Sequence, residues 1–228
     1  MKQPVVIWTI VTKQFEAAYA KVEAKLQQFH PDIPRIVYRE DWLNEQIHND
    51  PRFTFDFIGL TLSTSYPIIT AMLGKQYDRV IHIDSDVFIF GPLDELFGDF
   101  DCACLQDMNI GVHVSTSEAF NEDWLQLTLT DKDKYLDGDQ SCFNLVAHNG
   151  KHNFKPLGEK SYYSCVASYH ASDIFMVNGV PCFHGVPLAM LHIAGRWGLP
   201  IKNLTVEKDD QHFPLLPDTY EYFRREFP

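Results

Sequence analysis

Short apolar runs and one amphipathic segment alternate at the start of the chain. Residues 5–11 form a continuous apolar run rich in β-branched residues, which is typical of a strand covered on both faces. Apolar residues then recur at helical spacing over residues 15–29, after Thr12 as a candidate N-cap, and residues 35–38 fit a second strand. A strand–helix–strand opening predicts an α/β fold with a parallel sheet.

The rest of the chain also alternates between expected strands and helices, and most of these elements are shorter. We expect one helix capped by Ser65 with Pro67 in its first turn, and another capped by Ser117. At 228 residues the chain is long enough for one sizeable core, so we expect a single domain over residues 1–228. The other expected elements are strands at 80–83, 101–105, 111–114, 145–147 and 176–177, an apolar element at 188–193, short helices at 93–97 and within the loop 40–60, and a helix at 219–227.

Two carboxylates, Asp84 and Asp86, follow the expected strand at residues 80–83. Carboxylates beside a core strand are costly unless they are paired or bind a cation. At the carboxyl end of a strand they can point into the crevice where open α/β sheets bind ligands. Two hard oxygen ligands suit Mg²⁺ or Mn²⁺ held partly by substrate phosphates. The alternative is a strand end with two solvated acidic residues before the Gly91-Pro92 turn.

Two further stretches offer polar groups to a ligand. In residues 109–112, Gly111 would let the backbone approach a ligand closely and the Asn109 amide could hydrogen-bond a hydroxyl, although the stretch also fits an ordinary turn. In residues 137–144, Asp139 could stabilise positive charge, or the polar side chains could bind the hydroxyl rim of a sugar. The same residues also fit the N-cap of a helix that starts near Gln140.

His192 lies between apolar residues, a setting typical of a core histidine. It becomes a candidate metal ligand because the Asp84–Asp86 pair lacks a third one. A neutral imidazole suits Mn²⁺ and is a poor ligand for Mg²⁺, so His192 favours manganese. After it, Gly195 would leave room for phosphate oxygens and Arg196 could neutralise them.

Charge and composition narrow the classes of partner. A net charge of −12 argues against nucleic acid or anionic lipid as a partner, and a bound diphosphate would need a divalent cation, a helix N-terminus or a local basic group. Five cysteines without a C-x-x-C pair fit reduced thiols. The N-terminal residues lack a secretory layout and no apolar run approaches the length of a membrane span, so we expect a cytoplasmic protein without direct membrane insertion.

Four motifs occur in order along the chain. A hydrophobic strand ends in Ile83-Asp84-Ser85-Asp86-Val87, and N-x-G-V, G-D-Q-x-x-x-N and H-x-x-G follow at residues 109–112, 138–144 and 192–195. In this order they resemble the GT-A glycosyltransferases of family 8, which include glycogenin and bacterial lipopolysaccharide sugar transferases. The resemblance covers residues 4 to about 200. It implies a three-layer αβα sandwich around a mostly parallel, mixed central sheet.

The resemblance also implies a role for individual positions. Asp84, Asp86 and His192 would bind Mn²⁺, with Mg²⁺ as the alternative, beside the diphosphate of the donor. Asp139 and Gln140 would lie at the reacting centre. The remaining implied donor contacts are Thr9 after the first strand in the nucleotide pocket, Ser85 near the ribose, Asn109 and Gly111 facing the donor sugar, and Gly195 and Arg196 at the pyrophosphate. The family usually has a phosphate-binding lysine after H-x-x-G, and here Arg196 or Lys202 is a candidate substitute.

The implied reaction is transfer of a hexose from a nucleoside-diphosphate sugar, a UDP-sugar, to a glycan, lipid or protein acceptor, with retention of the anomeric configuration. A divalent cation would stabilise the charge that builds on the leaving diphosphate. One alternative is a sugar-nucleotide-binding module without turnover. Another is a haloacid-dehalogenase-like phosphatase, whose nucleophile motif is also D-x-D after a strand, but the threonine usual two positions on is replaced by Phe88.

Overall fold

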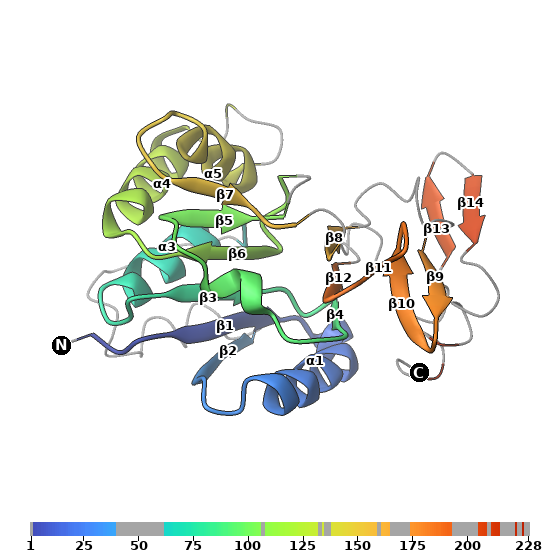
Figure 1. Ribbon diagram of the computed structural model, residues 1–228. Helices are drawn as coiled ribbons and strands as arrows, with labels where there is room; N and C mark the ends of the chain where they lie inside the picture. The colour runs from blue at the N-terminus through green and yellow to red at the C-terminus, as the bar shows by residue number, and fades with distance from the viewer. Residues whose placement is uncertain are drawn as a thin grey trace.

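A computed structural model describes residues 2–39, 62–105, 108–131, 134, 138–158, 161–164, 174–192, 205–208, 211–214, 222 and 225 (Figure 1). The expected loop and short helix at residues 40–60 lie outside the described residues, and so does nearly all of the expected helix at 219–227. Gly195 and Arg196 also lie outside them.

A six-stranded sheet forms the centre of the fold, in the order β2-β1-β3-β6-β5-β7. Every neighbouring pair is parallel except those that involve β6, which runs antiparallel to both β3 and β5. This confirms the expected mostly parallel, mixed sheet. Its strands are β1 (Val6–Val11), β2 (Arg35–Arg39), β3 (Val80–Ile83), β5 (Cys102–Cys104), β6 (Val112–Ser115) and β7 (Phe154–Pro156).

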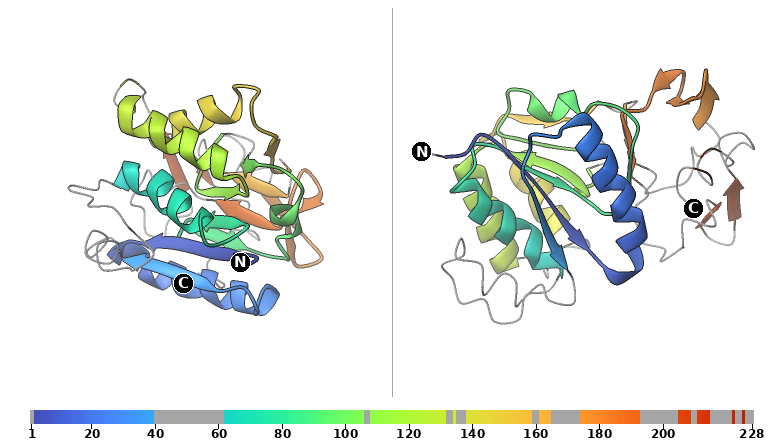
Figure 2. Two further views of the ribbon diagram at one scale, coloured as in Figure 1. Left: turned by 90° about the vertical axis from the view of Figure 1, so that its left-hand side faces the viewer. Right: turned by 90° about the horizontal axis from the view of Figure 1, so that it is seen from below.

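Helices cover both faces of this sheet (Figure 2). Helix α1 (Glu16–Phe29), which follows the short 3-10 helix η1 (Lys13–Phe15), packs on one face. Helices α3 (Leu62–Gly74), α4 (Glu118–Asp131) and α5 (Asp139–Ala147) pack on the other. The result is the expected three-layer αβα sandwich.

The continuous apolar run of β1 follows from these two layers. Successive side chains of a strand point to opposite faces, so both sets must be apolar when both faces are covered. Ile7 and Val11 belong to the core under α1, whereas Trp8 and Ile10 pack with residues of α3. All six residues of β1 are buried.

A smaller sheet joins the central sheet at the carboxyl end of β3 (Figure 1). Its order is β4-β12-β8, with β4 (Val87–Ile89) antiparallel to β12 (Met190–His192) and β8 (Tyr162–Ser164) parallel to β12. The 3-10 helix η3 (Asp94–Phe97) follows β4. The chain therefore crosses from the central sheet to the smaller one between Ile83 and Val87.

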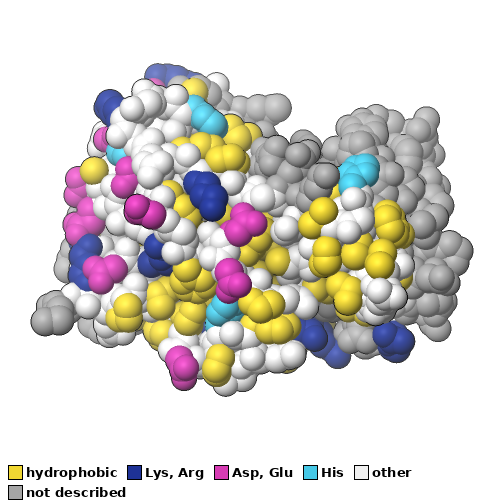
Figure 3. All heavy atoms as spheres, viewed as in Figure 1, with side chains coloured by type: hydrophobic (Ala, Val, Ile, Leu, Met, Phe, Trp, Pro, Cys, Tyr) yellow, Lys and Arg dark blue, Asp and Glu magenta, His cyan; other side chains and the backbone are white. Residues whose placement is uncertain are grey.

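Two hairpin sheets complete the described chain. One consists of β9 (Ile174–Val177), β10 (Val180–Phe183) and β11 (Val186–Pro187), and the other of β13 (Thr205–Lys208) and β14 (Gln211–Pro214). Apolar side chains gather over the first of these sheets in Figure 3, where Val177 and Val180 are 40% and 41% exposed. Among the helices of the described residues, none is long and apolar enough to cross a membrane.

Several local expectations need correction. Helix α3 begins at Leu62, so Ser65 is a buried interior residue rather than its cap, and Pro67 lies beyond the first turn. Residues 145–147 are the last turn of α5 and not a strand. The prediction was wrong because a short apolar run fits a buried strand and a buried helix equally well. Thr12 occupies the N-cap position of η1 without a side-chain capping bond. By contrast, Ser117 does cap α4, since its Oγ accepts the Phe120 N–H at 3.3 Å.

The close packing of α3 against α4 depends on Gly74. A Cβ added there would lie 2.4 Å from Nδ2 of Asn121, a 2% exposed side chain of α4 whose Oδ1 accepts the Ser115 hydroxyl at 2.6 Å. We therefore expect Gly74→Ala to lower the free energy of unfolding by about 1–3 kcal/mol through overpacking. Urea unfolding followed by circular dichroism measures this change.

Gly91→Ala is the matched control, because a Cβ at Gly91 meets nothing within 4 Å. It should change the free energy of unfolding by no more than about 0.5 kcal/mol. Equal stability of the two variants would contradict the proposed contact between Gly74 and Asn121.

Candidate metal centre and active site

The turn between the two sheets presents the D-x-D carboxylates. Strand β3 ends at Ile83, and the backbone N–H of Asp84 donates to the Gly111 carbonyl at 2.7 Å, which extends the β3–β6 ladder by one residue. The chain then turns through Ser85 and Asp86 into β4, in the smaller sheet. Both carboxylates therefore project from a short turn that is fixed at each end by a different sheet.

Strand β12 brings His192 to this turn from a distant part of the chain. Its antiparallel register with β4 places His192 opposite Val87, the residue after Asp86. Nε2 of His192 lies 3.2 Å from Oδ1 of Asp86 and 3.5 Å from Oδ2 of Asp84. One ligand atom from each of the three residues lies within 4.8 Å of the others. The structure thus brings together all three residues of the expected metal site.

These three groups are largely shielded from water. His192 is 2% and Asp86 9% exposed, and the side chain of Asp84 is 22% exposed. Burial lowers the pKa of His192, but the nearby charges of Asp86 and Asp84 outweigh it and raise the pKa to about 10. Burial raises the pKa of Asp84, yet the imidazoles of His192 and His82 hold it well below its usual range. The carboxylate of Asp84 is therefore ionised at neutral pH.

The arrangement fits a divalent cation. Although Nε2 of His192 is buried and close to both carboxylates, neither contact has hydrogen-bond geometry, and the atom has no hydrogen-bond partner among the described residues. Two ligand atoms that each lie about 2.1 Å from one cation are at most about 4.2 Å apart. The contacts of His192 Nε2 with Asp84 and Asp86 meet that limit. Two carboxylates and an imidazole are a donor set that suits Mn²⁺.

Gly111 provides the space for this cluster. A Cβ at Gly111 would lie 2.3 Å from Cε1 of His192 and 2.6 Å from Oδ2 of Asp84. Both distances are shorter than any normal contact, so a side chain here would displace the imidazole or the carboxylate. The glycine of the N-x-G-V motif is needed because the imidazole and carboxylate pack directly on it.

Helix α5 holds the loop that contains Gly111. Oε1 of Gln140 accepts the Ile110 N–H at 3.3 Å, and Nδ2 of Asn144 donates to the Met108 carbonyl at 2.9 Å. Within the loop, Oδ1 of Asn109 accepts the Gly111 N–H at 2.7 Å. Gln140 of the G-D-Q-x-x-x-N motif is therefore hydrogen-bonded directly to the N-x-G-V motif, and Asn144 is bonded to Met108, the residue just before that motif.

Asp139 is the first residue of α5, and it is 7% exposed. Its Oδ1 accepts the Gln140 N–H at 3.0 Å, and its backbone carbonyl accepts the indole N–H of Trp124 at 2.9 Å. The N-cap position of the helix belongs to Gly138, with φ of +53°, and not to an aspartate. A carboxyl group in the first turn of a helix lies beside the positive end of the helix dipole, which favours its ionised form.

Two of the expected nucleotide contacts lie deeper than the sequence indicated. Thr9 is inside β1, and not after it, with 1% exposure and with its side chain on the face of the sheet that α1 covers. Ser85, in the turn between the carboxylates, is 6% exposed. The expected pyrophosphate contacts Gly195 and Arg196 lie outside the described residues.

Sequence reasoning missed two residues that contact Asp84. Nε2 of His82 lies 2.8 Å, and the hydroxyl of Tyr66 3.0 Å, from Oδ1 of Asp84. Burial, together with the charges of Asp84 and Asp139, raises the pKa of Tyr66 well above its usual range, so the hydroxyl remains protonated. The signal for His82 was present in the sequence, because residues two apart on a strand point to the same face.

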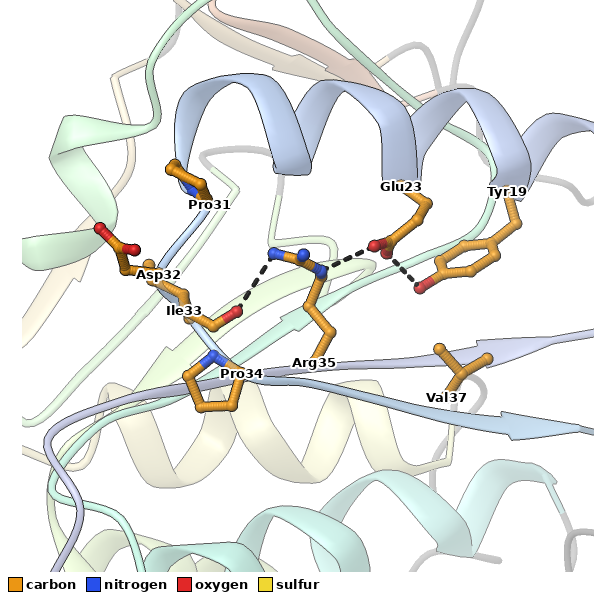
Figure 4. Close-up of a pocket in the computed structure, with 8 residues that line it drawn as sticks. All are labelled: Tyr19, Glu23, Pro31, Asp32, Ile33, Pro34, Arg35 and Val37. Atoms are coloured by element: carbon orange, nitrogen blue, oxygen red, sulfur yellow. Dashed lines mark hydrogen bonds and ion pairs between the residues drawn. The ribbon is translucent and has the colours of Figure 1, made fainter.

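A separate hollow of about 550 Å³ lies beside α1 and β2 (Figure 4). Its most polar member, Arg35, donates through Nε to Glu23 at 2.7 Å and through Nη1 to the carbonyls of His30 and Ile33 at 3.2 and 3.1 Å. Nη2 donates to Gln27. The guanidinium is thus engaged by the protein itself, and none of the expected site residues lines this hollow.

Solved glycosyltransferases share this fold. GlyE of Streptococcus pneumoniae TIGR4 is 14% identical with a TM-score of 0.61, over 98% of this chain and 60% of GlyE. The bifunctional glycosyltransferase WbbM is 12% identical with a TM-score of 0.57, over the whole of this chain and 50% of WbbM. The galactosyltransferase LgtC, solved with donor and acceptor sugar analogues, is 14% identical with a TM-score of 0.53, over 96% of this chain and 94% of LgtC.

The likeness establishes that this chain has the GT-A glycosyltransferase fold. The chain spans 60% of the length of GlyE and half of that of WbbM. No protein-family model matches the sequence. No curated protein matches it either.

Gly111→Ala tests the packing of the metal centre. The added Cβ should displace the ring of His192 from Asp84, and we expect the dissociation constant for Mn²⁺ to rise by at least about tenfold. Isothermal titration with MnCl₂ measures this change, and Gly91→Ala again serves as the control glycine. Unchanged Mn²⁺ affinity in Gly111→Ala would show that His192 and Asp84 do not act together on a cation.

Proposed function

We propose that this protein is a metal-dependent glycosyltransferase that moves a hexose from a nucleoside-diphosphate sugar to an acceptor. The observation that supports this most directly is the convergence of Asp84, Asp86 and His192 at the junction of two sheets in a GT-A fold. The proposed donor is a UDP-sugar. The proposed domain comprises residues 1–228, and the resemblance to family 8 supports retention of the anomeric configuration.

The proposed metal is Mn²⁺, with Mg²⁺ as the alternative, bound by Asp84, Asp86 and His192. When bound, such a cation stabilises the negative charge that builds on the leaving diphosphate. This neutralisation is one of the ways in which a protein of net charge −12 can bind a diphosphate. His192 favours Mn²⁺ because an imidazole nitrogen is a poor ligand for the harder Mg²⁺.

The proposed reacting centre is the start of α5. Asp139 is a carboxyl group held in a buried position, and in its ionised form it would stabilise the positive charge that develops on the sugar during transfer. Gln140 accepts a hydrogen bond from the Ile110 N–H through Oε1, so its amide N–H₂ group is the end that can donate to a hydroxyl of the donor or acceptor. Gln140 is joined by a hydrogen bond to the loop that carries Gly111, and Asp139, the residue before it, accepts the Gln140 N–H.

The remaining donor contacts are proposed from the motifs. Asn109 and Gly111 face the sugar, Ser85 and Thr9 lie towards the nucleoside, and Gly195 and Arg196 contact the pyrophosphate.

The acceptor is a glycan, a lipid or a protein. A cytoplasmic location is proposed because four cysteines of the described chain are buried thiols that form no disulfide, which suits a reducing compartment.

Asp86→Asn tests the function. The change keeps the shape of the side chain and removes one metal-binding charge, so transfer or hydrolysis of the UDP-hexose should fall by at least about a hundredfold. Binding of UDP in the presence of Mn²⁺ should weaken in parallel. A panel of UDP-hexoses, followed by release of UDP, measures turnover, and titration calorimetry measures binding.

Asp78→Asn is the matched control, since it removes the same charge from an exposed residue just before the opposite end of β3. It should leave both readouts unchanged. A fully active Asp86→Asn would contradict the proposal. Mn²⁺-dependent UDP binding without turnover of any donor would favour a binding module, and a covalent phosphate trapped on Asp84 would favour a phosphatase.

A further inference from the structure

The two oxygens of the Asp84 carboxylate have different surroundings. Oδ1 is 2.8 Å from Nε2 of His82 and 3.0 Å from the hydroxyl of Tyr66. Oδ2 instead faces the metal centre, 3.5 Å from Nε2 of His192 and against Gly111. The carboxylate therefore separates a hydrogen-bonded side from a side open to a cation.

The chemistry of these groups fixes the direction of both hydrogen bonds. An ionised carboxylate only accepts, so Nε2 of His82 carries a proton and the Tyr66 hydroxyl donates. These two donors use both of the acceptor sites that one oxygen of an ionised carboxylate offers. Oδ1 then has no free direction for a metal ion, and Asp84 can bind a cation only through Oδ2.

The packing around His82 holds its ring in one orientation. His82 is fully buried, its ring centroid lies 4.2 Å from that of Trp8 and 4.8 Å from that of Tyr66, and its cross-strand partner His113 lies 4.9 Å away. His113 is itself fixed, because Nδ1 donates to the Ile110 carbonyl at 2.8 Å and Nε2 accepts the Thr70 hydroxyl at 3.1 Å. A ring packed in this way cannot swing to follow a moving carboxylate.

Alternation along β3 explains why His82 serves Asp84. Val80 packs on the α3 side of the sheet and Ile81 and Ile83 on the α1 side, so His82 and the next same-face residue, Asp84, both point towards α3. Tyr66 comes from α3 itself. Nδ1 of His82 is buried without a hydrogen-bond partner in the described part of the chain. His82 therefore makes its one side-chain hydrogen bond there to Asp84.

We propose that His82 and Tyr66 are positioning residues that hold Oδ1 of Asp84 and so present Oδ2 alone to the divalent cation. This inference rests on the proposed function, because it assumes that the Asp84–Asp86–His192 centre binds metal. It predicts that affinity for the metal depends on two side chains that never touch the ion. Donors to a metal-bound group typically change metal affinity by about 10–100-fold.

The test is a Mn²⁺ titration of the full chain, with and without UDP, in which electron paramagnetic resonance measures free Mn²⁺. His82→Leu and Tyr66→Phe each remove one donor to Asp84, and each should raise the dissociation constant about 10–100-fold. His82→Gln keeps an amide N–H near the position of Nε2 and should stay within about threefold of the unmodified chain. Weak Mn²⁺ binding by His82→Leu together with tight binding by His82→Gln would show that the affinity depends on the hydrogen bond to Asp84 and not only on a side chain that fills the core.

Thr70→Val is the matched control, because it removes a buried hydrogen bond to His113 in the same cluster without touching Asp84. It should lower the melting temperature and leave the Mn²⁺ affinity unchanged. If Tyr66→Phe, or His82→Leu where it folds, binds Mn²⁺ as tightly as the unmodified chain, the positioning role is wrong although the metal centre stands. If the unmodified chain itself binds no Mn²⁺, both the proposed function and this inference fail.

Discussion

The antiparallel pairing of β4 with β12 is the interaction on which the candidate site depends. The central sheet can place Asp84 at the end of β3, but His192 comes from a strand of the smaller sheet that lies far along the chain from β3. Only the register that sets His192 opposite Val87 brings its imidazole to the turn between the carboxylates. A slip of that register by one residue would turn His192 to the other face and separate the three ligands.

Electrostatics add a second constraint, because two carboxylates in a largely buried turn repel each other and lose hydration. Neighbouring groups offset this repulsion and the lost hydration. His192 lies against both carboxylates, His82 and Tyr66 donate to Asp84, and the backbone of Gly111 closes the remaining side. A divalent cation at this site would offset the remaining negative charge of the two carboxylates.

The sequence predicted most of the framework and the three residues that meet at the candidate metal centre. Periodicity was sufficient for β1, α1 and β3, where the runs are long or both faces are covered, and the order of four motifs indicated the GT-A fold. It failed for residues 145–147, which three apolar residues cannot assign to helix or strand, and for the start of α3. The contacts of Tyr66 and His82 with Asp84 were also missed, since they depend on which helix packs against one face of β3.

The most direct test of the account is anomalous diffraction at the manganese edge from crystals grown with Mn²⁺ and UDP. The account predicts one peak within about 2–2.5 Å of Oδ2 of Asp84, of a carboxylate oxygen of Asp86 and of Nε2 of His192, in contact with diphosphate oxygens. A peak bound elsewhere, or UDP bound with no manganese between it and these three side chains, would contradict it.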